Sequence, residues 1–350
     1  MSNNNRRNLQ ELFWLNTIMS TGVTNVRNKA KTFALIFVLG VMLPNLLIAV
    51  VSRHQTKEPV TLITAGTTES KQTQPDELMI PVLDKNGIVR NVSEDDYLTC
   101  VVLCEMPAEF EIEALKAQAI VARTYALRRQ KTGSKHPSAA VCMEPSCCQG
   151  YKSVEAYLSA GGTSADVEKI RHAVVSTRNT VLTYKGELIE ATYFSCSGGY
   201  TEDAQAVWGS DIPYLRATPS PGEEGAARYT DTVTFSTKEF LQKLGCKKPA
   251  GATGWLSDVE YTQGGGVASI RLCGKVFSGT TVRQLLGLRS TAFTITVLGD
   301  TVTVTTKGFG HRVGMSQYGA DAMAANGSDY KEILQHYYQG IELVQYASDD

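Results

Sequence analysis

The sequence predicts an α+β fold: a single mixed ectodomain with helices packed on mainly antiparallel β-structure, preceded by one transmembrane helix. Three observations favour it: an uncharged apolar run near the N-terminus, helical periodicity in the middle of the chain, and short β-branched runs in the C-terminal third. Strands and helices do not alternate regularly, which disfavours a doubly wound parallel sheet.

The apolar run Thr32–Val51 contains twenty residues without a charge, enough to cross a bilayer as a helix. Pro44 and Asn45 interrupt it, so a kink is expected there. A cleaved signal peptide is the alternative, but the run ends in a poor cleavage site before Ser52. Basic residues gather before the run: Arg6, Arg7, Arg27, Lys29 and Lys31. The positive-inside rule therefore places residues 1–31 in the cytoplasm and makes the chain a single-pass membrane protein whose main domain is extracytoplasmic.

Residues 52–77 are rich in Thr, Ser, Gln and Lys and are expected to form a solvated linker. The folded domain is predicted to span residues 78–345. It opens with two strands joined by an Asn86-Gly87 turn. Ser93, with Asp96 three residues later, resembles a helix cap and indicates that a helix begins there.

A longer helix is predicted over about residues 111–129. Its small and apolar residues share one buried face: Ile112, Leu115, Ala119, Ala122 and Ala126. Lys116 and Arg123 are seven residues apart and share an adjacent face. A third helix is expected over 164–177, followed by the strand pair VLTY and LIEATYF. Three β-branched runs follow, VASIRL, FTITVLG and TVTVTT, and a closing helix from Tyr330 to Gln339.

The composition gives no reason to expect nucleic acid as a partner. The chain has 350 residues, a formal net charge of −1 and a pI near 6.5, whereas nucleic-acid binders usually carry a strong basic excess. Its charged content of 20% and hydrophobic content of 43% are those of a globular protein rather than a disordered one.

Glu105 is the candidate acid, because it lies between an apolar helix and Pro107. Such a junction can bury a carboxyl group against apolar side chains, which favours the protonated form that a general acid needs. From spacing alone, a solvated glutamate at a helix end is the better interpretation. Glu111 and Glu113 are interpreted as structural, since carboxylates in a first helical turn are favoured by the helix dipole.

A second cluster lies in the segment HPSAAVCMEPSCC, which contains His136, Cys142, Cys147 and Cys148. Imidazole and thiolate ligands suit zinc, although the spacing matches no common finger or ribbon pattern. A disulfide between two of the cysteines is the alternative for a domain outside the cytoplasm.

Three segments together resemble the stage II sporulation protein D family: EMPAEFEIEALKAQAIVARTYAL, YFSCSGG and GFGHRVGMSQYGADAMA. The resemblance covers about residues 78–343. It implies a peptidoglycan lytic transglycosylase that cleaves glycan strands lacking stem peptides during engulfment of the forespore. It also implies a partner sporulation amidase and endopeptidase, and a membrane anchor protein of the engulfment complex. The catalytic glutamate of the family corresponds to Glu105.

One acid suffices for such a reaction. It protonates the glycosidic oxygen, and the 6-hydroxyl of the sugar then closes on C1 to give a 1,6-anhydromuramic end. A hydrolase would need a second carboxylate, for which Glu109 and Asp203 are the candidates.

The resemblance also implies substrate and metal contacts. Lys116 and Arg123 are expected to bind the acetamido oxygens or the lactyl carboxylate of muramic acid. Further substrate contacts are expected at Ser197, Gly198, Gly199, His311, Ser316, Gln317 and Tyr318, although the glycine segments can equally be tight turns. Arg312 stands where glycine is common in the motif. His136, Cys142 and Cys148 fit a His-x5-Cys-x5-Cys zinc site, which leaves Cys147 without a role.

Two other functions compete. The first is a cysteine or zinc amidase, with Cys196 as nucleophile and His311 as its base, although no third orienting residue is evident. Related proteins also include enhancers of cell-wall amidases, so a non-catalytic enhancer of a partner amidase is the other alternative.

Overall fold

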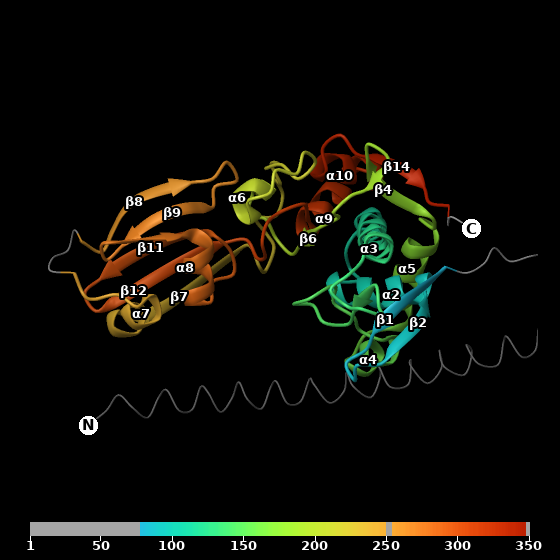
Figure 1. Ribbon diagram of the computed structural model, residues 1–350, viewed down its shortest axis with the longest axis horizontal. Helices are drawn as coiled ribbons and strands as arrows, with labels where there is room; N and C mark the ends of the chain where they lie inside the picture. Colours follow the sequence, from blue (N-terminus) through green and yellow to red (C-terminus); the bar gives the residue numbers. More distant parts are fainter. Residues whose placement is uncertain (1–77, 250–253, 348–350) are drawn as a thin grey trace, which may run out of the picture. The chain divides into compact units, whose positions relative to one another are not determined.

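The computed structural model describes residues 78–249 and 254–347, in which helices and strands follow one another irregularly (Figure 1). The mixed α+β class is confirmed. The predicted cytoplasmic segment, transmembrane helix and linker, residues 1–77, lie outside the described residues. Among the helices that are described, none is long and apolar enough to span a membrane.

The predicted opening hairpin is present. Strands β1 (Met79–Leu83) and β2 (Val89–Ser93) pair antiparallel, and β3 (Val141–Cys142) adds to β1 in parallel. The Ser93 hydroxyl accepts a hydrogen bond from the Asp96 backbone at 3.3 Å and caps α2 (Glu94–Glu105). Met106 is extended, as expected for a residue before proline, and ends this helix at Glu105.

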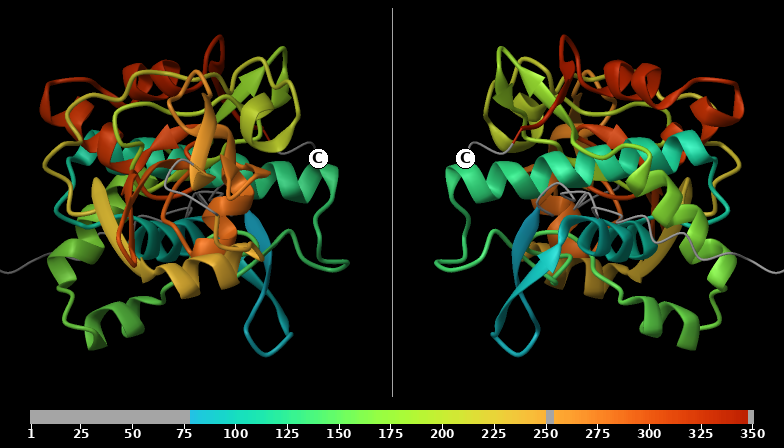
Figure 2. Two further views of the ribbon diagram at one scale, coloured as in Figure 1. Left: turned by 90° about the vertical axis from the view of Figure 1, so that its left-hand side faces the viewer. Right: turned by 90° about the vertical axis from the view of Figure 1, so that its right-hand side faces the viewer.

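Helix α3 (Ile112–Thr132) is the centre of the first hydrophobic core. It contacts α2, α5 (Ser164–Val175), β4 (Thr180–Tyr184), α9 (Gln317–Ala325) and α10 (Tyr330–Tyr337). Both views in Figure 2 show α3 passing between α2 and the C-terminal helices. Its alanines are small enough to let neighbours approach on several sides, so it is buried well beyond the single predicted face.

Arg123 lies inside this core with no exposed surface. Its guanidinium forms an ion pair with the Glu94 carboxylate. It also donates to the backbone carbonyls of Thr177 at 2.8 Å, Val174 at 3.2 Å and Thr180 at 3.4 Å, and thereby holds the end of α5 and the start of β4 on α3. Lys116 is partly exposed and pairs with Glu113 at 2.7 Å.

The predicted strand LIEATYF is divided. Its beginning, β5 (Glu187–Leu188), pairs with β4, whose other neighbour is β14 (Glu342–Gln345). Its end, β6 (Tyr193–Phe194), pairs in parallel with β13 (Met315–Ser316). Between β5 and β6, the Glu190 side chain forms ion pairs with Arg128 and Arg129 on α3. The division brings the YFSCSGG segment beside the GHRVGMSQYG segment.

Residues 230–307 form a second hydrophobic core. One antiparallel sheet contains β7 (Thr230–Ser236), β11 (Ala292–Leu298) and β12 (Thr301–Lys307), and another contains β8 (Leu256–Tyr261), β9 (Val267–Leu272) and β10 (Lys275–Ser278). Helices α7 (Thr237–Leu244) and α8 (Gly279–Leu286) contribute to it. Short helices α4 (Val154–Ser159) and α6 (Ala204–Trp208) lie outside this segment. The sequence predicts three of these strands but not a separate core.

Arg123→Ala should strongly destabilise the fold, because it leaves the Glu94 carboxylate buried without its cation and removes hydrogen bonds to three backbone carbonyls. Breaking a buried pair from one side costs about 3–5 kcal/mol. The matched control Lys116→Ala removes a partly exposed pair and should cost less than about 1 kcal/mol. Urea unfolding of both variants measures this, and similar losses would contradict a structural role for Arg123.

Candidate active site

A cavity of about 770 Å³ brings together segments that are distant in the sequence. It is lined by the end of α2 with the loop that follows it, the segment after the cysteine cluster, β6, the loop before β13 and the start of α9. The lining includes Glu105, Glu109, Tyr125, Cys148, Gln149, Lys152, Tyr193, Phe194, Arg228, Phe309, His311, Gln317 and Tyr318.

Glu105 lines this cavity at the C-terminal end of α2. Its side chain is partly buried, and its Oε1 accepts a hydrogen bond from the Gly150 backbone at 2.6 Å. A Cβ at position 150 would lie 2.8 Å from both this oxygen and the Cys104 sulfur. Only glycine therefore allows the backbone to approach the carboxylate this closely.

A chain of side-chain hydrogen bonds leads to Glu105 from the core. The Tyr97 hydroxyl donates to Gln149 Oε1 at 2.9 Å, and Gln149 Nε2 donates to the Tyr193 hydroxyl at 3.2 Å. Tyr193 is in turn a hydrogen-bond partner of Glu105. Burial first, and then the Glu105 charge, raise the pKa of Tyr193 well above its ordinary value. Tyr193 is therefore a neutral phenol that can donate to the Glu105 carboxylate.

The two candidates for a second carboxylate differ in position. Glu109 is exposed and lines the cavity. Asp203 caps α6 by accepting from the Gln205 backbone at 2.8 Å and pairs with Arg216 at 3.1 Å, and it does not line the cavity. Among the described residues, Glu105 and Glu109 are thus the carboxylates available to a ligand there.

Ser197, Gly198, Gly199 and Ser316, which the resemblance predicted as substrate contacts, do not line the cavity. Ser197, Gly198 and Ser316 instead donate to the buried carboxylate of Glu223 at 2.6–3.1 Å. Gly198 has a φ of 75°, and a Cβ there would lie 2.8 Å from the Gly308 backbone nitrogen. These serines and glycines form tight turns around Glu223. The sequence allowed either substrate contacts or tight turns for the glycine segments.

His311, Gln317 and Tyr318, also predicted from the resemblance, do line the cavity. Tyr318 packs edge-on against Phe110 with ring centroids 5.0 Å apart, and Gln317 donates to Gln118 at 3.4 Å. The His311 ring packs against the rings of Phe194 and Trp208, with ring centroids 5.7 and 5.3 Å apart, respectively. Burial, followed by the charge of Arg283, lowers the pKa of His311 to about 4, so the imidazole is neutral at pH 7.

Lys116 and Arg123 do not line the cavity either. Arg123 has no exposed surface and supports the packing of α3. Lys116 pairs with Glu113, and its ammonium lies 5.9 Å from the centroid of the Tyr330 ring, so its substrate contact stays a prediction.

Cys196 is poorly suited to be a nucleophile. Its thiol is fully buried and donates to Glu223 at 3.1 Å rather than to His311. Burial, with the neighbouring Glu223 charge, raises the pKa of Cys196 to about 12, so its thiolate is scarce at pH 7. This arrangement disfavours the cysteine amidase alternative.

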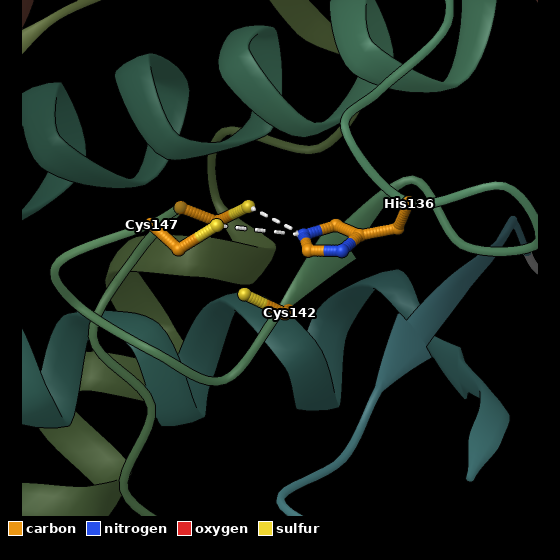
Figure 3. Close-up of side chains that lie close together, drawn as sticks. His136, Cys142 and Cys147 are labelled. Carbon is orange, nitrogen blue, oxygen red and sulfur yellow. Dashed lines mark hydrogen bonds between the residues drawn. The ribbon is translucent and has the colours of Figure 1, made fainter. Parts of the chain in front are cut away.

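His136, Cys142, Cys147 and Cys148 form a cluster whose ligand atoms all lie within 4.8 Å of one another (Figure 3). His136 Nε2 lies 3.4 Å from the Cys148 sulfur and 3.6 Å from the Cys147 sulfur. In a tetrahedral site with zinc–sulfur bonds of about 2.3 Å, the ligand atoms are separated by roughly 3.8 Å. The four donors therefore fit such an ion, and Cys147, which the sequence left without a role, supplies the fourth.

Comparison with known proteins identifies the family. A sequence profile of the stage II sporulation protein family matches residues 84–184. The chain is 43% identical over 265 residues to stage II sporulation protein D of Bacillus subtilis (strain 168), covering 74% of this chain and 77% of the relative. The chain belongs to the stage II sporulation protein D family. The resemblance predicted from the three segments is thus confirmed.

Two further relatives extend the comparison. Stage II sporulation protein D of Bacillus amyloliquefaciens is 42% identical over 264 residues, with 74% of this chain and 76% of the relative covered. An amidase enhancer of Bacillus subtilis (strain 168) is 30% identical over 302 residues, which cover 70% of this chain and 40% of that protein. Similarity to the two sporulation proteins connects this family member with sporulation.

Several residues of the site were not identified from the sequence. Tyr193 is the first residue of the recognised segment YFSCSGG, and Gln149 directly follows the cysteine cluster, but neither was singled out as a site residue. Glu223 and Arg228 lie in EEGAARYT, outside every recognised segment, so nothing in the sequence indicated either of them.

Stability should fall in acid partly because of His311. Its folded pKa of about 4 lies below the unfolded value of about 6.5, so the unfolded chain binds a proton first as the pH drops between these values. The difference between the folded and unfolded pKa values corresponds to about 3 kcal/mol of unfolding free energy. This contribution to stability is lost as the pH falls to about 4. His311→Asn should reduce the stability difference between pH 7 and pH 4 by about this amount in urea unfolding. An unchanged pH dependence would contradict the lowered pKa.

Proposed function

We propose that this chain is a membrane-anchored peptidoglycan lytic transglycosylase in which Glu105 is the general acid and then the base. The observation that carries the proposal is the placement of Glu105 on the 770 Å³ cavity, with its carboxylate held by the Gly150 backbone and by Tyr193. Membership of a sporulation family supports a cell-wall substrate, namely glycan strands lacking stem peptides, during forespore engulfment.

The proposed reaction needs one carboxyl group. Protonated Glu105 gives its proton to the glycosidic oxygen as the C1–O bond breaks and positive charge develops at C1. The carboxylate then takes the proton of the sugar's 6-hydroxyl, whose oxygen bonds to C1 and forms the 1,6-anhydro end. Hydrogen bonds from Gly150 and Tyr193 orient the carboxylate and stabilise it after it has lost its proton.

Neighbouring residues can position the sugars. Tyr318 and the neutral His311 offer ring faces on the cavity wall, and Gln317 offers an amide. Glu109 is the other carboxylate on the wall, and a water activated by it would give hydrolysis instead. Mass analysis of a digest distinguishes the two, because anhydro ends indicate a transglycosylase and reducing ends indicate a hydrolase.

Zinc is the proposed cofactor, held by His136, Cys142 and Cys148 with Cys147 as fourth ligand. Burial, with the neighbouring Cys148 and Cys147 thiols, raises the pKa of Cys142 to about 12, and a bound cation would allow these crowded sulfurs to ionise. The bound ion would supply a structural clamp on the loop that ends at Cys148, directly before Gln149, which donates to Tyr193, and Gly150, which donates to Glu105.

The second candidate is an enhancer of a partner cell-wall amidase. The 30% identity to an amidase enhancer favours it. In either case we expect residues 1–31 in the cytoplasm, the domain outside, and partners that include a sporulation amidase and endopeptidase and a membrane anchor protein. The purified chain added to bare glycan strands separates the candidates, because an enhancer alone releases nothing.

Glu105→Gln should lower the rate of glycan cleavage by at least about 100-fold while the protein stays folded. Gln keeps the shape of the side chain but has no proton to transfer, and general acid catalysis supplies about two to four orders of magnitude. The matched control is Glu109→Gln, on the same cavity wall, which should act nearly as the unmodified chain. A sensitive Glu109 and a tolerant Glu105 would refute the assignment.

The purified chain should carry close to one zinc ion, measured by elemental analysis. His136→Ala or Cys148→Ala should lose most of it, because removing a ligand from a four-ligand site weakens binding severely. Cys147→Ala should lose zinc as well if this thiol is the fourth ligand. Metal-free protein with a disulfide between Cys142 and either neighbour would overturn the zinc site.

A further inference from the structure

The charges that line the cavity are balanced. Glu105 and Glu109 are its carboxylates, Lys152 and Arg228 are its cations, and His311 is neutral at pH 7. A ligand that itself carries carboxylates would be repelled by Glu109, and by Glu105 whenever it is ionised, unless Lys152 or Arg228 binds it. The cations therefore decide whether an anionic glycan can bind here.

Arg228 is a cation available to a ligand. It is exposed on the cavity wall, and among residues 78–249 and 254–347 its side chain has neither an ion-pair partner nor a hydrogen-bond acceptor. Its guanidinium lies 4.9 Å from the centroid of the Phe309 ring. Stacking on a ring occupies one face of the guanidinium and leaves the N–H groups along its edge free to donate.

Backbone hydrogen bonds hold both Phe309 and the residue that follows Arg228. Phe309 donates its backbone N–H to the Cys196 carbonyl at 2.7 Å and accepts from the Cys196 N–H at 3.1 Å. The residue after Arg228, Tyr229, accepts from the Gly308 backbone at 2.7 Å. Both the arginine backbone and the ring beneath its side chain are thus fixed before a ligand arrives, which lowers the entropy cost of binding.

A second arginine beside the Phe309 ring is already ion-paired and is not available to a ligand. Arg289 lies 5.7 Å from the Phe309 centroid, but it is paired with Asp231 at 3.2 Å and does not line the cavity. Lys152 lines the cavity, and its charge acts on Cys104, the residue before Glu105. Lys152 is partly buried, with its ammonium 5.8 Å from the centroid of the Tyr157 ring, so the exposed Arg228 is the cation more open to a ligand.

We propose that Arg228 binds a free carboxylate of the glycan and makes the cavity selective for strands whose muramic acids carry it. An arginine fork matches a carboxylate with two parallel hydrogen bonds. The lactyl carboxylate is free only where no stem peptide is attached, since the peptide converts it into an uncharged amide. The inference rests on the proposed function and assigns to Arg228 the role first expected of Lys116 and Arg123.

The test compares two substrates: denuded glycan strands, and the same strands with their carboxylates converted to N-methyl amides. The full-length chain should cleave the carboxylate strands with a kcat/KM about 10- to 100-fold higher, the range of one charge-assisted contact. Arg228→Ala should lose this preference by slowing cleavage of the carboxylate strands alone, and Arg228→Lys should restore part of it. Arg289→Ala, the matched control, should keep the preference.

Binding separates this inference from the proposed function. Calorimetry with the Glu105→Gln chain measures the affinity for both strands without any cleavage, and Arg228→Ala in that background should remove the preference for carboxylate strands. If no strand is cleaved but this binding preference is found, the proposed function fails and the inference stands. Equal affinity for both strands, or an Arg228→Ala chain that keeps the preference, would overturn the inference.

Discussion

The buried carboxylate of Glu223 is the interaction on which the arrangement of the cavity depends. One oxygen accepts from the Cys196 thiol, the Ser197 backbone and hydroxyl and the Gly198 backbone, and the other accepts from the hydroxyls of Ser220 and Ser316. A carboxylate removed from water is costly unless such donors surround it. Because the donors come from segments more than one hundred residues apart, satisfying Glu223 forces these segments together.

The contacts of Glu223 position cavity-lining residues on two elements, α9 and β6. Ser316 also caps α9 by accepting from the Gly319 backbone at 3.3 Å, so holding Ser316 fixes the first turn, which presents Gln317 and Tyr318. The turn at Ser197 follows β6, whose Tyr193 reaches Glu105. The serines and glycines of the two recognised segments are therefore required by the architecture, which places other residues against the ligand.

Features that depend on residues close together in the sequence could be predicted, whereas features that depend on contacts between distant segments could not. The hairpin, the Ser93 cap and the buried stripe of α3 depend on neighbours a few residues away, and those predictions are confirmed. The position of Glu105 followed from Pro107 and from the resemblance. Arg123 was misplaced because helical periodicity gives the angle of a residue around the helix, whereas its burial depends on α5 and β4 covering that side. Tyr193, Glu223 and Arg228 acquire their roles only through contacts with distant segments.

Arg312 shows how the second core is joined to this arrangement. Its φ of 67° lies in the left-handed region, where the family motif favours glycine and where another residue is strained. The side chain offsets that cost inside the protein, because it donates to the carbonyls of Ser197 and Tyr200 at 2.7 Å and of Gly264 at 2.6 Å and pairs with Glu202 at 3.2 Å. Gly264 belongs to the β8–β9 turn, so the turn around Glu223 is held from both cores. A glycine at this position would relieve the strain but would give up that connection.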